Sequence, residues 1–428
     1  MTHLIRLLST VLCMLALMMF NGMANAVPSF ARQTGMSCAS CHTVFPELTP
    51  FGRQFKLDGY TLAGTKQVQS PTSKENSALK INELPPLSAM LLIGYTHVKQ
   101  PADTVQNDSI AFPQELSLFY AGEISEKLGA FLQLTYEQAS DNLSWDNADI
   151  RYADHTQLGE QAVTYGVTLN NSPTVQDLWN STPVWGIPYV SSDAAATPSN
   201  STLLEGILAQ DVAGLGGYAM WNHRYYTELS LYRSAHLGND QLPPNSTSEN
   251  TISGVAPYLR LAWENNTENH STMLGLIGMQ ADIYPTGVSG SSDRYADIGV
   301  DGQYQGKLGG NAVSAHASYI QEKRTLDATD PGAAPKLNSF KIDGSYFWSH
   351  HLVGTLGYFN LSGDDNTNDV WGTGITSPDS DGWSAELGYL PWQNTKLTAQ
   401  YRMYGKFDGT STDASNNDTL YLNAWFVW

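Results

Sequence analysis

Hydrophobic and polar residues alternate with a period of two along most of the chain from about residue 86 onward. The last nine residues show it clearly: Leu420, Leu422, Ala424, Phe426 and Trp428 alternate with Tyr421, Asn423, Trp425 and Val427. A strand with this period presents one set of side chains to each face. In a membrane barrel one face meets lipid and the other the lumen, and a terminal aromatic residue suits the interface. The edge of a soluble β-sandwich is the alternative, and it would not need a terminal aromatic residue.

Sixteen runs with this alternation, each about ten residues long, follow one another along the chain. They lie near 86–98, 111–124, 127–138, 145–154, 161–170, 211–222, 224–234, 254–265, 269–283, 294–305, 309–323, 335–348, 351–363, 381–391, 394–406 and 416–428. An even number of antiparallel strands is the rule in bacterial outer-membrane barrels. The pattern therefore predicts an all-β fold, an antiparallel transmembrane barrel of about 16 strands.

The links between these runs alternate in length. Short links lie at 124–128, 222–224, 305–310 and 349–351, and long ones at 99–110, 171–210, 235–253, 363–380 and 407–415. Short turns face the periplasm in such barrels and long loops face outward, so sixteen strands bring both barrel ends to the periplasmic side. The longest link contains Trp179, Pro183, Trp185 and Pro188. We expect it to fold partly into the lumen and narrow it, with an external lid as the alternative.

Composition agrees with a secreted membrane protein and changes the list of partners. The chain has 41 acidic and 22 basic residues, and only 15% of its residues are charged. This acidic balance argues against nucleic acid as a partner, because binding phosphates needs a basic surface. No apolar run after residue 26 reaches the ~20 residues that a transmembrane helix needs. We expect outer-membrane lipid as the surroundings of the barrel.

The N-terminus has the three regions of a secretory signal peptide. Arg6 supplies the positive charge, residues 12–20 the apolar core, and residues 24–26 (Ala-Asn-Ala) the cleavage site. Cleavage there would leave Val27 as the first residue of the mature chain. A membrane anchor is the alternative, but the apolar core is too short for one. The chain thus divides into a signal peptide (1–26), a short N-terminal segment with linker (27–80) and a barrel (81–428).

The mature chain keeps two cysteines, and both belong to one motif. Cys13 lies in the signal peptide, whereas Cys38 and Cys41 stand two residues apart and His42 follows directly. A C-x-x-C-H sequence is the attachment signal for a c-type haem. Its two thiols add to the vinyl groups of one porphyrin, and its imidazole ligates the iron. A disulfide between the two cysteines is the alternative in an oxidising compartment. We expect one covalent haem c, with His42 as the proximal ligand.

The segment that carries this motif (27–80), here called the haem segment, is predicted to contain one capped helix. Thr49 reads as an N-cap, Pro50 as the first helical residue, and Gly59 as the residue that ends the helix at about 58. Phe51 and Phe55 would share one face and cover the haem, or simply form core. About fifty residues are too few for an independent core. We therefore expect this segment to plug the barrel, with polar residues 65–80 as a linker.

Other residues are candidates for contact with the haem. Arg53 and Lys56 could neutralise propionates, although basic residues in short helices are often solvated. Methionine and histidine are the usual sixth ligands of cytochromes c. His316 and Met90 have the parity that faces the lumen and are candidate distal ligands of the iron. Met36 is near in sequence, but we expect it to be too constrained to reach the opposite haem face.

Residues 27–64 resemble one known family. Segments 27–36 (VPSFARQTGM), 46–53 (PELTPFGR) and 56–60 (KLDGY), around the C-x-x-C-H motif, are similar to the fused monohaem cytochrome–porins of the outer membrane. These proteins are best known as the iron(II) oxidases of iron-oxidising bacteria. Over the barrel the similarity is one of architecture: strand number, length and terminal strand.

The resemblance implies roles for residues and partners. It implies haem ligation by Cys38, Cys41 and His42. It also implies one-electron transfer from an extracellular donor, through the haem, to a periplasmic cytochrome or copper protein. If the chain is an enzyme, it would be an iron(II) oxidase of the iron–cytochrome c reductase type.

The donor and two further functions stay open at this point. No fixed iron(II)-binding motif is present, and the donor could be another reductant. Predicted outer loops do contain acidic residues that would concentrate a dication or simply be solvated: Asp364, Asp365, Asp369, Asp379, Asp381, Asp408 and Asp413. The alternatives are a solute porin with a structural or sensory haem, and a peroxidase-like enzyme. The latter would need a distal His/Arg pair, and the sequence offers no convincing one.

Overall fold

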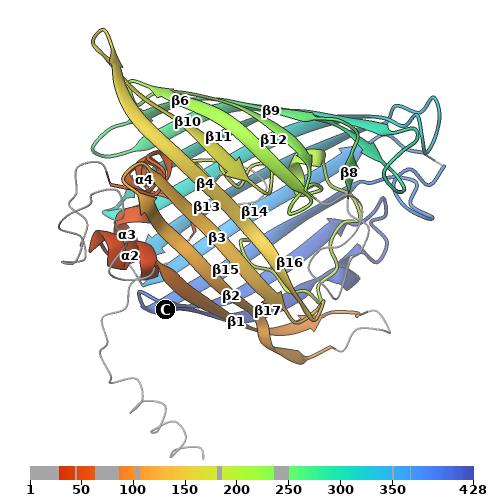
Figure 1. Ribbon diagram of the computed structural model, residues 1–428. Coiled ribbons are helices and arrows are strands. Elements are labelled where there is room, and N and C mark those ends of the chain that lie inside the picture. Colours follow the sequence, from red (N-terminus) through yellow and green to blue (C-terminus); the bar gives the residue numbers. More distant parts are fainter. Residues whose placement is uncertain are drawn as a thin grey trace, which may run out of the picture.

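The computed structural model describes residues 28–43, 46–62, 86–101, 107–180, 186–235, 250–348, 351–366 and 368–428. The predicted signal peptide, the predicted linker, Pro183 and Trp185 lie outside the described residues. Figure 1 shows a barrel of tilted strands with a small helical unit at one end.

Sixteen strands of nine residues or more form the wall within these ranges. They are β1 (Leu87–Val98), β2 (Ser109–Ser125), β3 (Leu128–Glu137), β4 (Asn142–Leu158), β5 (Gln161–Asn170), β6 (Val212–Trp221), β7 (Tyr225–Ser234), β9 (Ala256–Asn266), β10 (Ser271–Tyr284), β11 (Asp293–Leu308), β12 (Asn311–Thr325), β13 (Lys336–Trp348), β14 (Leu352–Gly363), β15 (Ser380–Trp392), β16 (Thr395–Lys406) and β17 (Thr419–Val427). The predicted number is confirmed, and each predicted run coincides with one strand to within four residues at each end. The sequence did not predict β8 (Thr251–Ile252), a two-residue strand that pairs with β10.

The barrel is closed by its first and last strands. β1 pairs antiparallel with both β2 and β17, with Met90 opposite Val427 and Val98 opposite Thr419. The other strands follow in an antiparallel ring. Closure leaves no unpaired edge, as a β-structure in lipid requires.

Side chains alternate between lumen and exterior as the sequence predicts. In β9, Arg260 and Glu264 are buried, whereas Leu259, Leu261 and Trp263 are exposed. A closed barrel with an apolar exterior and polar residues inside is suited to the bacterial outer membrane. The chain is therefore an outer-membrane β-barrel protein.

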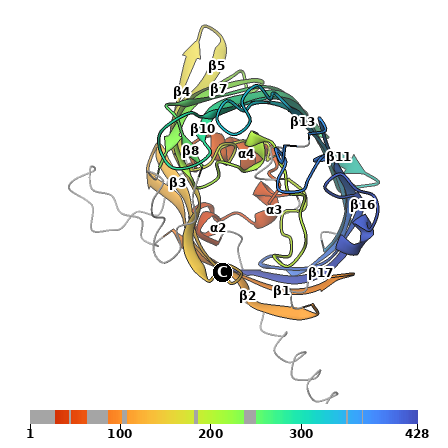
Figure 2. The same ribbon diagram turned by 90° about the vertical axis from the view of Figure 1, so that its right-hand side faces the viewer.

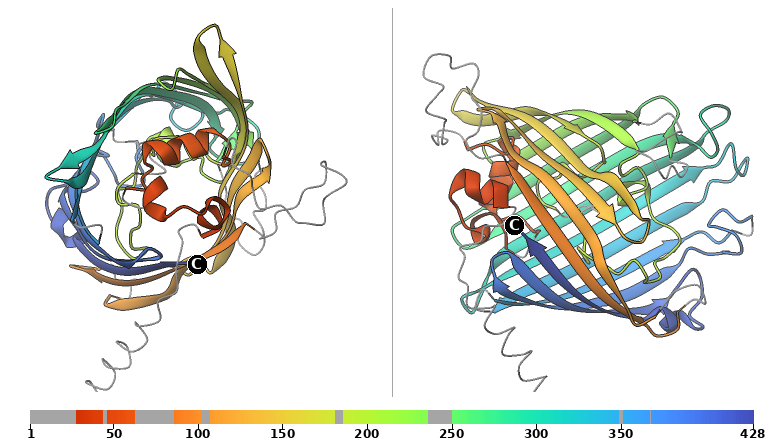
Figure 3. Two further views of the ribbon diagram at one scale, coloured as in Figure 1. Left: turned by 90° about the vertical axis from the view of Figure 1, so that its left-hand side faces the viewer. Right: turned by 60° about the horizontal axis from the view of Figure 1, so that its bottom comes forward.

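The two ends of the barrel differ. Short turns of two to four residues at 126–127, 159–160, 222–224, 267–270 and 309–310 lie at one end. The C-terminus and the helices lie at that end too (Figures 1 and 3). Long connections lie at the other end. By the rule for these barrels, the helices occupy the periplasmic mouth.

In the described part of the chain before the barrel, the helices are α2 (Pro28–Thr34), α3 (Cys38–Cys41) and α4 (Pro50–Leu57). Two 3-10 helices, η3 (Leu203–Glu205) and η4 (Ala414–Asn417), lie in long connections. The α4 boundaries are confirmed, because the Thr49 hydroxyl accepts a hydrogen bond from the Gly52 amide at 3.1 Å and Gly59 has φ +70°. Among the described residues, no helix is long and apolar enough to span a membrane.

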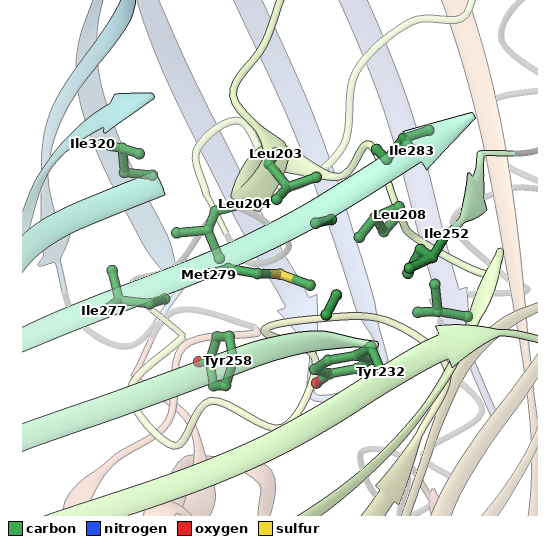
Figure 4. Close-up of a cluster of buried hydrophobic side chains, with 13 residues drawn as sticks. Leu203, Leu204, Leu208, Tyr232, Ile252, Tyr258, Ile277, Met279, Ile283 and Ile320 are labelled. Atoms are coloured by element: carbon green, nitrogen blue, oxygen red, sulfur yellow. The ribbon is translucent and has the colours of Figure 1, made fainter. Parts of the chain in front are cut away.

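The described parts of the long connection between β5 and β6 (171–180 and 186–211), here called the inward loop, fold into the lumen (Figure 2). Leu203, Leu204 and Leu208 of this loop are buried against lumen-facing side chains of the wall (Figure 4). Those wall residues include Tyr232, Ile252, Tyr258, Ile277, Met279, Ile283 and Ile320. This apolar patch inside the barrel holds the loop in place, and the prediction that it narrows the lumen is confirmed.

Candidate functional site

The described helical unit, here called the plug (residues 28–62), fits inside the periplasmic mouth (Figure 3). Phe30 lies at its centre, with ring centroids 5.1 Å from Phe55 and 5.5 Å from Tyr60. Backbones also meet closely, since a β-carbon on Gly129 of β3 would overlap the Gly59 carbonyl oxygen. The small aromatic core is thus completed by the wall, as the shortness of the segment predicts.

Arg53 fixes the plug to the wall through buried polar contacts. Its guanidinium donates to Glu264 on β9 at 2.7 Å, to Ser271 on β10 at 2.6 Å and to Gln305 on β11 at 2.8 Å. Arg53 is 3% exposed and Glu264 is equally buried. These contacts occupy the guanidinium, so its role in the structure is anchoring rather than the propionate contact suggested by the sequence.

Lys56 joins the plug to the inward loop. Its ammonium nitrogen donates to the carbonyl oxygens of Val175 at 2.8 Å and Asp177 at 2.7 Å. Burial lowers the pKa of Lys56 from 10.5 to about 7. On the same side, the Asn180 amide donates to the Pro46 carbonyl at 3.0 Å. The inward loop therefore covers the plug from the lumen side.

The two motif cysteines lie on α3, one turn apart, and no disulfide joins them in the structure. Helix α4 crosses close behind, because a β-carbon on Gly52 would overlap the Cys41 carbonyl oxygen. Burial and the neighbouring Cys38 raise the pKa of the Cys41 thiol to about 11. Cys38 lies toward the mouth, with its sulfur 3.6 Å from the Gln393 carbonyl in the β15–β16 turn.

His42 is held in one orientation by the plug backbone. It pairs with Leu48 in an isolated antiparallel β-bridge. The Nδ1 atom lies 3.2 Å from the Pro46 carbonyl oxygen and 3.2 Å from the Glu47 carbonyl oxygen. Two acceptors at Nδ1 fix the proton there, so Nε2 carries the lone pair. Burial lowers the pKa of His42 to about 4, which keeps the imidazole neutral.

A cavity of about 310 Å³ lies directly against this motif. Cys38, Cys41 and His42 line it together with Met90. The remaining lining residues are mostly apolar or aromatic and include Phe30, Phe55, Phe119, Phe131 and Val427. A second space of about 1160 Å³ starts at the same motif and opens among the turns of the mouth. The motif therefore stands between a sheltered apolar space and the periplasmic opening.

The structure places the other sequence candidates differently from one another. Met90 on β1 faces the lumen, is 6% exposed and lines the cavity beside His42. His316 on β12 also faces the lumen, but it does not line this cavity and lies in a separate polar one. Phe55 reaches the motif cavity, whereas Phe51 is 36% exposed and does not.

Two residues near His316 were not predicted from the sequence to belong to a site. Glu47 of the plug and Asp343 of β13 bring their carboxylates to the His316 ring. Glu47 lies just after the C-x-x-C-H motif, in the segment that resembles cytochrome–porins. The resemblance identified this segment but gave no role to the Glu47 side chain. Asp343 could have been found only by its inward parity on β13.

Comparisons with known proteins find similar folds among solved outer-membrane barrels. No protein-family model matches the sequence, and no curated protein matches it. Among solved structures, the Salmonella typhi OmpF complex with daunomycin is 13% identical, covers 80% of this chain and 97% of its own, and has a TM-score of 0.47. The outer-membrane channel DcaP of Acinetobacter baumannii is 12% identical, with coverage of 80% and 96% and a TM-score of 0.48. An anion-selective porin from Comamonas acidovorans is 15% identical, with coverage of 80% and 98% and a TM-score of 0.46.

Proposed function

We propose that this outer-membrane barrel is an electron-transfer protein that carries one c-type haem on its plug. The observation that carries the proposal is the setting of the C-x-x-C-H motif. Cys38, Cys41 and His42 meet at one apolar cavity inside the barrel mouth. The haem held by these residues would supply one-electron chemistry between iron(III) and iron(II), with an external iron(II) donor oxidised to iron(III) in exchange.

The residues around the motif have the chemistry that a haem needs. Cys38 and Cys41 would hold the porphyrin by two thioether bonds. His42 is neutral, and its Nδ1–H donates to backbone carbonyls, the arrangement that orients a metal-ligating histidine and raises its basicity. The apolar lining would exclude water and thereby tune the potential of the iron.

We propose that Met90 would be the second protein ligand of the haem iron. It is buried, comes from the wall rather than the plug, and lines the same cavity as His42. A thioether opposite an imidazole raises the potential of a cytochrome c. His316 fits less well, because it lies in another cavity and its Nδ1 is 2.9 Å from the Asp343 carboxylate.

The position of the plug supports a direction for the electrons. The inward loop covers the plug on the lumen side, while Cys38 lies beside the Gln393 turn at the periplasmic mouth. We propose that the donor is iron(II) arriving from outside and the acceptor a periplasmic cytochrome or copper protein. The resemblance of residues 27–64 to fused cytochrome–porins supports the same assignment.

Covalent haem is tested on the denatured chain. We expect the mature protein, expressed in a strain that matures c-type cytochromes, to keep a haem absorbance after unfolding and acetone extraction. The double variant Cys38→Ser/Cys41→Ser should lose it while remaining in the outer-membrane fraction. A wild-type chain that releases all of its haem to acetone, or never acquires any, would refute the proposal.

A solute porin is the second candidate, because part of the lumen is polar. A cavity of about 400 Å³ lies beyond the plug and is lined by residues such as Ser318, Ser339 and Lys341. Planar-bilayer recordings separate the two functions. A plugged electron carrier passes little ion current, whereas a porin conducts steadily whether the haem is oxidised or reduced.

A further inference from the structure

A cluster of one histidine and two carboxylates lies next to the haem motif and joins the plug to the wall. His316 Nδ1 is 2.9 Å from Asp343 Oδ2 and 3.8 Å from Glu47 Oε1. One donor atom from each of the three side chains lies within 4.8 Å of the other two. The three residues, here called the triad, come from the plug, β12 and β13.

The charges in the triad are those of a cation site. Two carboxylates meet one imidazole, and Glu47 is fully buried while the Asp343 side chain is 11% exposed. Buried charges require partners of the opposite sign, and a protonated His316 imidazole would balance only one of the two carboxylates. The cations nearby are engaged elsewhere, Arg53 with Glu264 and Lys341 with Glu205. A divalent ion at the centre would balance the carboxylates.

The donor atoms also favour a class of metal. Carboxylate oxygens combined with one imidazole nitrogen suit divalent iron, manganese or cobalt better than soft ions, which prefer sulfur. Glu47 is oriented for this use: Thr43 donates to its Oε2 at 2.8 Å, and Ser314 and Tyr189 donate to its Oε1 at 3.1 and 3.2 Å. A carboxylate has about four lone-pair sites, so these bonds leave room for a metal.

A separate observation at Gln303 points to the same ligand. Its Nε2 lies 2.9 Å from His316 Nε2, while its Oε1 has no hydrogen-bond partner among the described residues although the side chain is 4% exposed. Rotating the Gln303 side-chain amide by 180° exchanges the positions of its Nε2 and Oε1 atoms. The Oε1 atom would then accept Nε2–H from His316, and Nδ1 would be able to give its lone pair to an ion held between the two carboxylates. One rotation satisfies the buried oxygen and is compatible with the tautomer that binds a metal through Nδ1.

An ion could reach the triad from the outer side. His316 and Asp343 line the polar cavity of about 400 Å³, which extends along the inward loop past Asn200. Its far end includes Leu361, near the end of β14 that leads into an outer loop. The cavity thus connects the triad with the half of the lumen that faces outward.

Glu47 connects the triad with the haem motif. Its carboxylate belongs to the triad, and its backbone carbonyl lies 3.2 Å from Nδ1 of His42. We propose that Glu47, His316 and Asp343 bind one divalent transition-metal cation. This ion is the iron(II) donor, and Glu47 links it to His42, the proximal haem ligand. The donor role rests on the proposed function, whereas the binding site does not.

Cobalt(II) is the probe, because it prefers the same ligands as iron(II) and has visible absorption bands of its own. Purified haem-loaded protein in detergent is titrated with Co²⁺ by calorimetry, with the visible bands as a second readout. We expect one Co²⁺ per chain. Asp343→Asn and Glu47→Gln, both nearly isosteric, should each weaken binding by about tenfold or more. Asp365→Asn, in an exposed acidic loop, should bind like wild type.

The outcomes distinguish the two proposals. Absence of saturable Co²⁺ binding by wild type, or equal binding by the two triad variants, would overturn the metal site and leave an internal ion pair. Heat-modifiable migration on gels verifies that each variant forms the barrel. If haem is reduced by iron(II) although the triad binds no Co²⁺, only the site fails. If the chain carries no haem, the proposed function fails while the titration still tests the triad.

Discussion

Two histidines inside this barrel show how their surroundings select different chemistry. His42 of the plug directs Nδ1 at two backbone carbonyls and borders an apolar cavity. His316 of the wall directs Nδ1 at two carboxylates and borders a polar cavity. Neutral acceptors and burial keep the first imidazole uncharged and ready for a haem iron. Carboxylates around the second favour a cation at its centre.

The comparison also assigns roles to the two parts of the molecule. The plug supplies the C-x-x-C-H motif, and the wall supplies Met90 on β1 and His316 on β12. Glu47 is the link, since its backbone contacts one histidine and its side chain contacts the other. Displacing the plug from the wall would therefore disrupt both histidine sites at the same time.

The largest effect is expected from exchanging the two histidines for alanine one at a time. His42→Ala should abolish the low-spin haem spectrum, because the proximal ligand is lost. His316→Ala should leave that spectrum unchanged and affect only cation binding. Absorbance spectra of the oxidised and reduced protein report the state of the haem in each of the two variants. A normal spectrum in His42→Ala, or a lost one in His316→Ala, would reverse the assignment.

Met90 and Met36 form the next pair, because both line the motif cavity but only Met90 comes from the wall. Met90→Leu should remove the sulfur-to-iron charge-transfer band and lower the haem potential. Met36→Leu, of equal size, should leave both unchanged. Spectroelectrochemical titration supplies the band and the potential together. If the Met36 variant alone loses the band, the second ligand belongs to the plug.

Arg53 tests whether buried contacts keep the two histidine sites together. Arg53→Ala leaves Glu264 as a buried carboxylate without its guanidinium and should destabilise plug docking by about 3–5 kcal/mol. Arg294→Ala is the matched control, because the Arg294–Asp282 pair is largely exposed and should contribute at most about 1 kcal/mol. Protease cleavage of the plug in increasing urea reports docking. Equal urea profiles for the two variants would contradict the account.

Lys56 gives the smallest effect for a single step of its experiment, a dependence of docking on pH of at most about 1.4 kcal/mol per pH unit. Its pKa is about 7 in the docked plug and returns to 10.5 when the plug is displaced into water. Between these values the displaced form binds one more proton, so docking weakens as pH falls from 10.5 toward 7. The equilibrium constant for docking changes by at most about tenfold per pH unit. The same protease assay at several pH values should show a shallower slope for Lys56→Met, and an unchanged slope would exclude Lys56 as the source.

Most of the barrel could be predicted from the sequence because alternation is a local signal. The terminal strand, the sixteen runs and the Thr49 cap each depend on residues a few positions apart. The inward orientation of Met90 and His316 also follows from parity alone. Which cavity each one reaches depends on where the plug sits, and no local pattern encodes that.

The partners of the plug could not be predicted for the same reason. Arg53 and Lys56 looked like candidates for propionates, yet their partners are Glu264 on the wall and carbonyls of the inward loop. The triad unites Glu47 with residues on two late strands. Such contacts are set by the register of a closed barrel around a docked plug, which only the assembled fold provides.

Mixing oxidised, detergent-purified protein with iron(II) and following the haem absorbance tests the central claim most directly. The account predicts reduction of the haem by iron(II), saturating with iron concentration in wild type and much slower in Asp343→Asn. Dithionite should reduce both proteins fully, which verifies that the haem is intact. A haem that dithionite reduces but iron(II) does not, at the working pH of the organism, would contradict iron(II) as the donor.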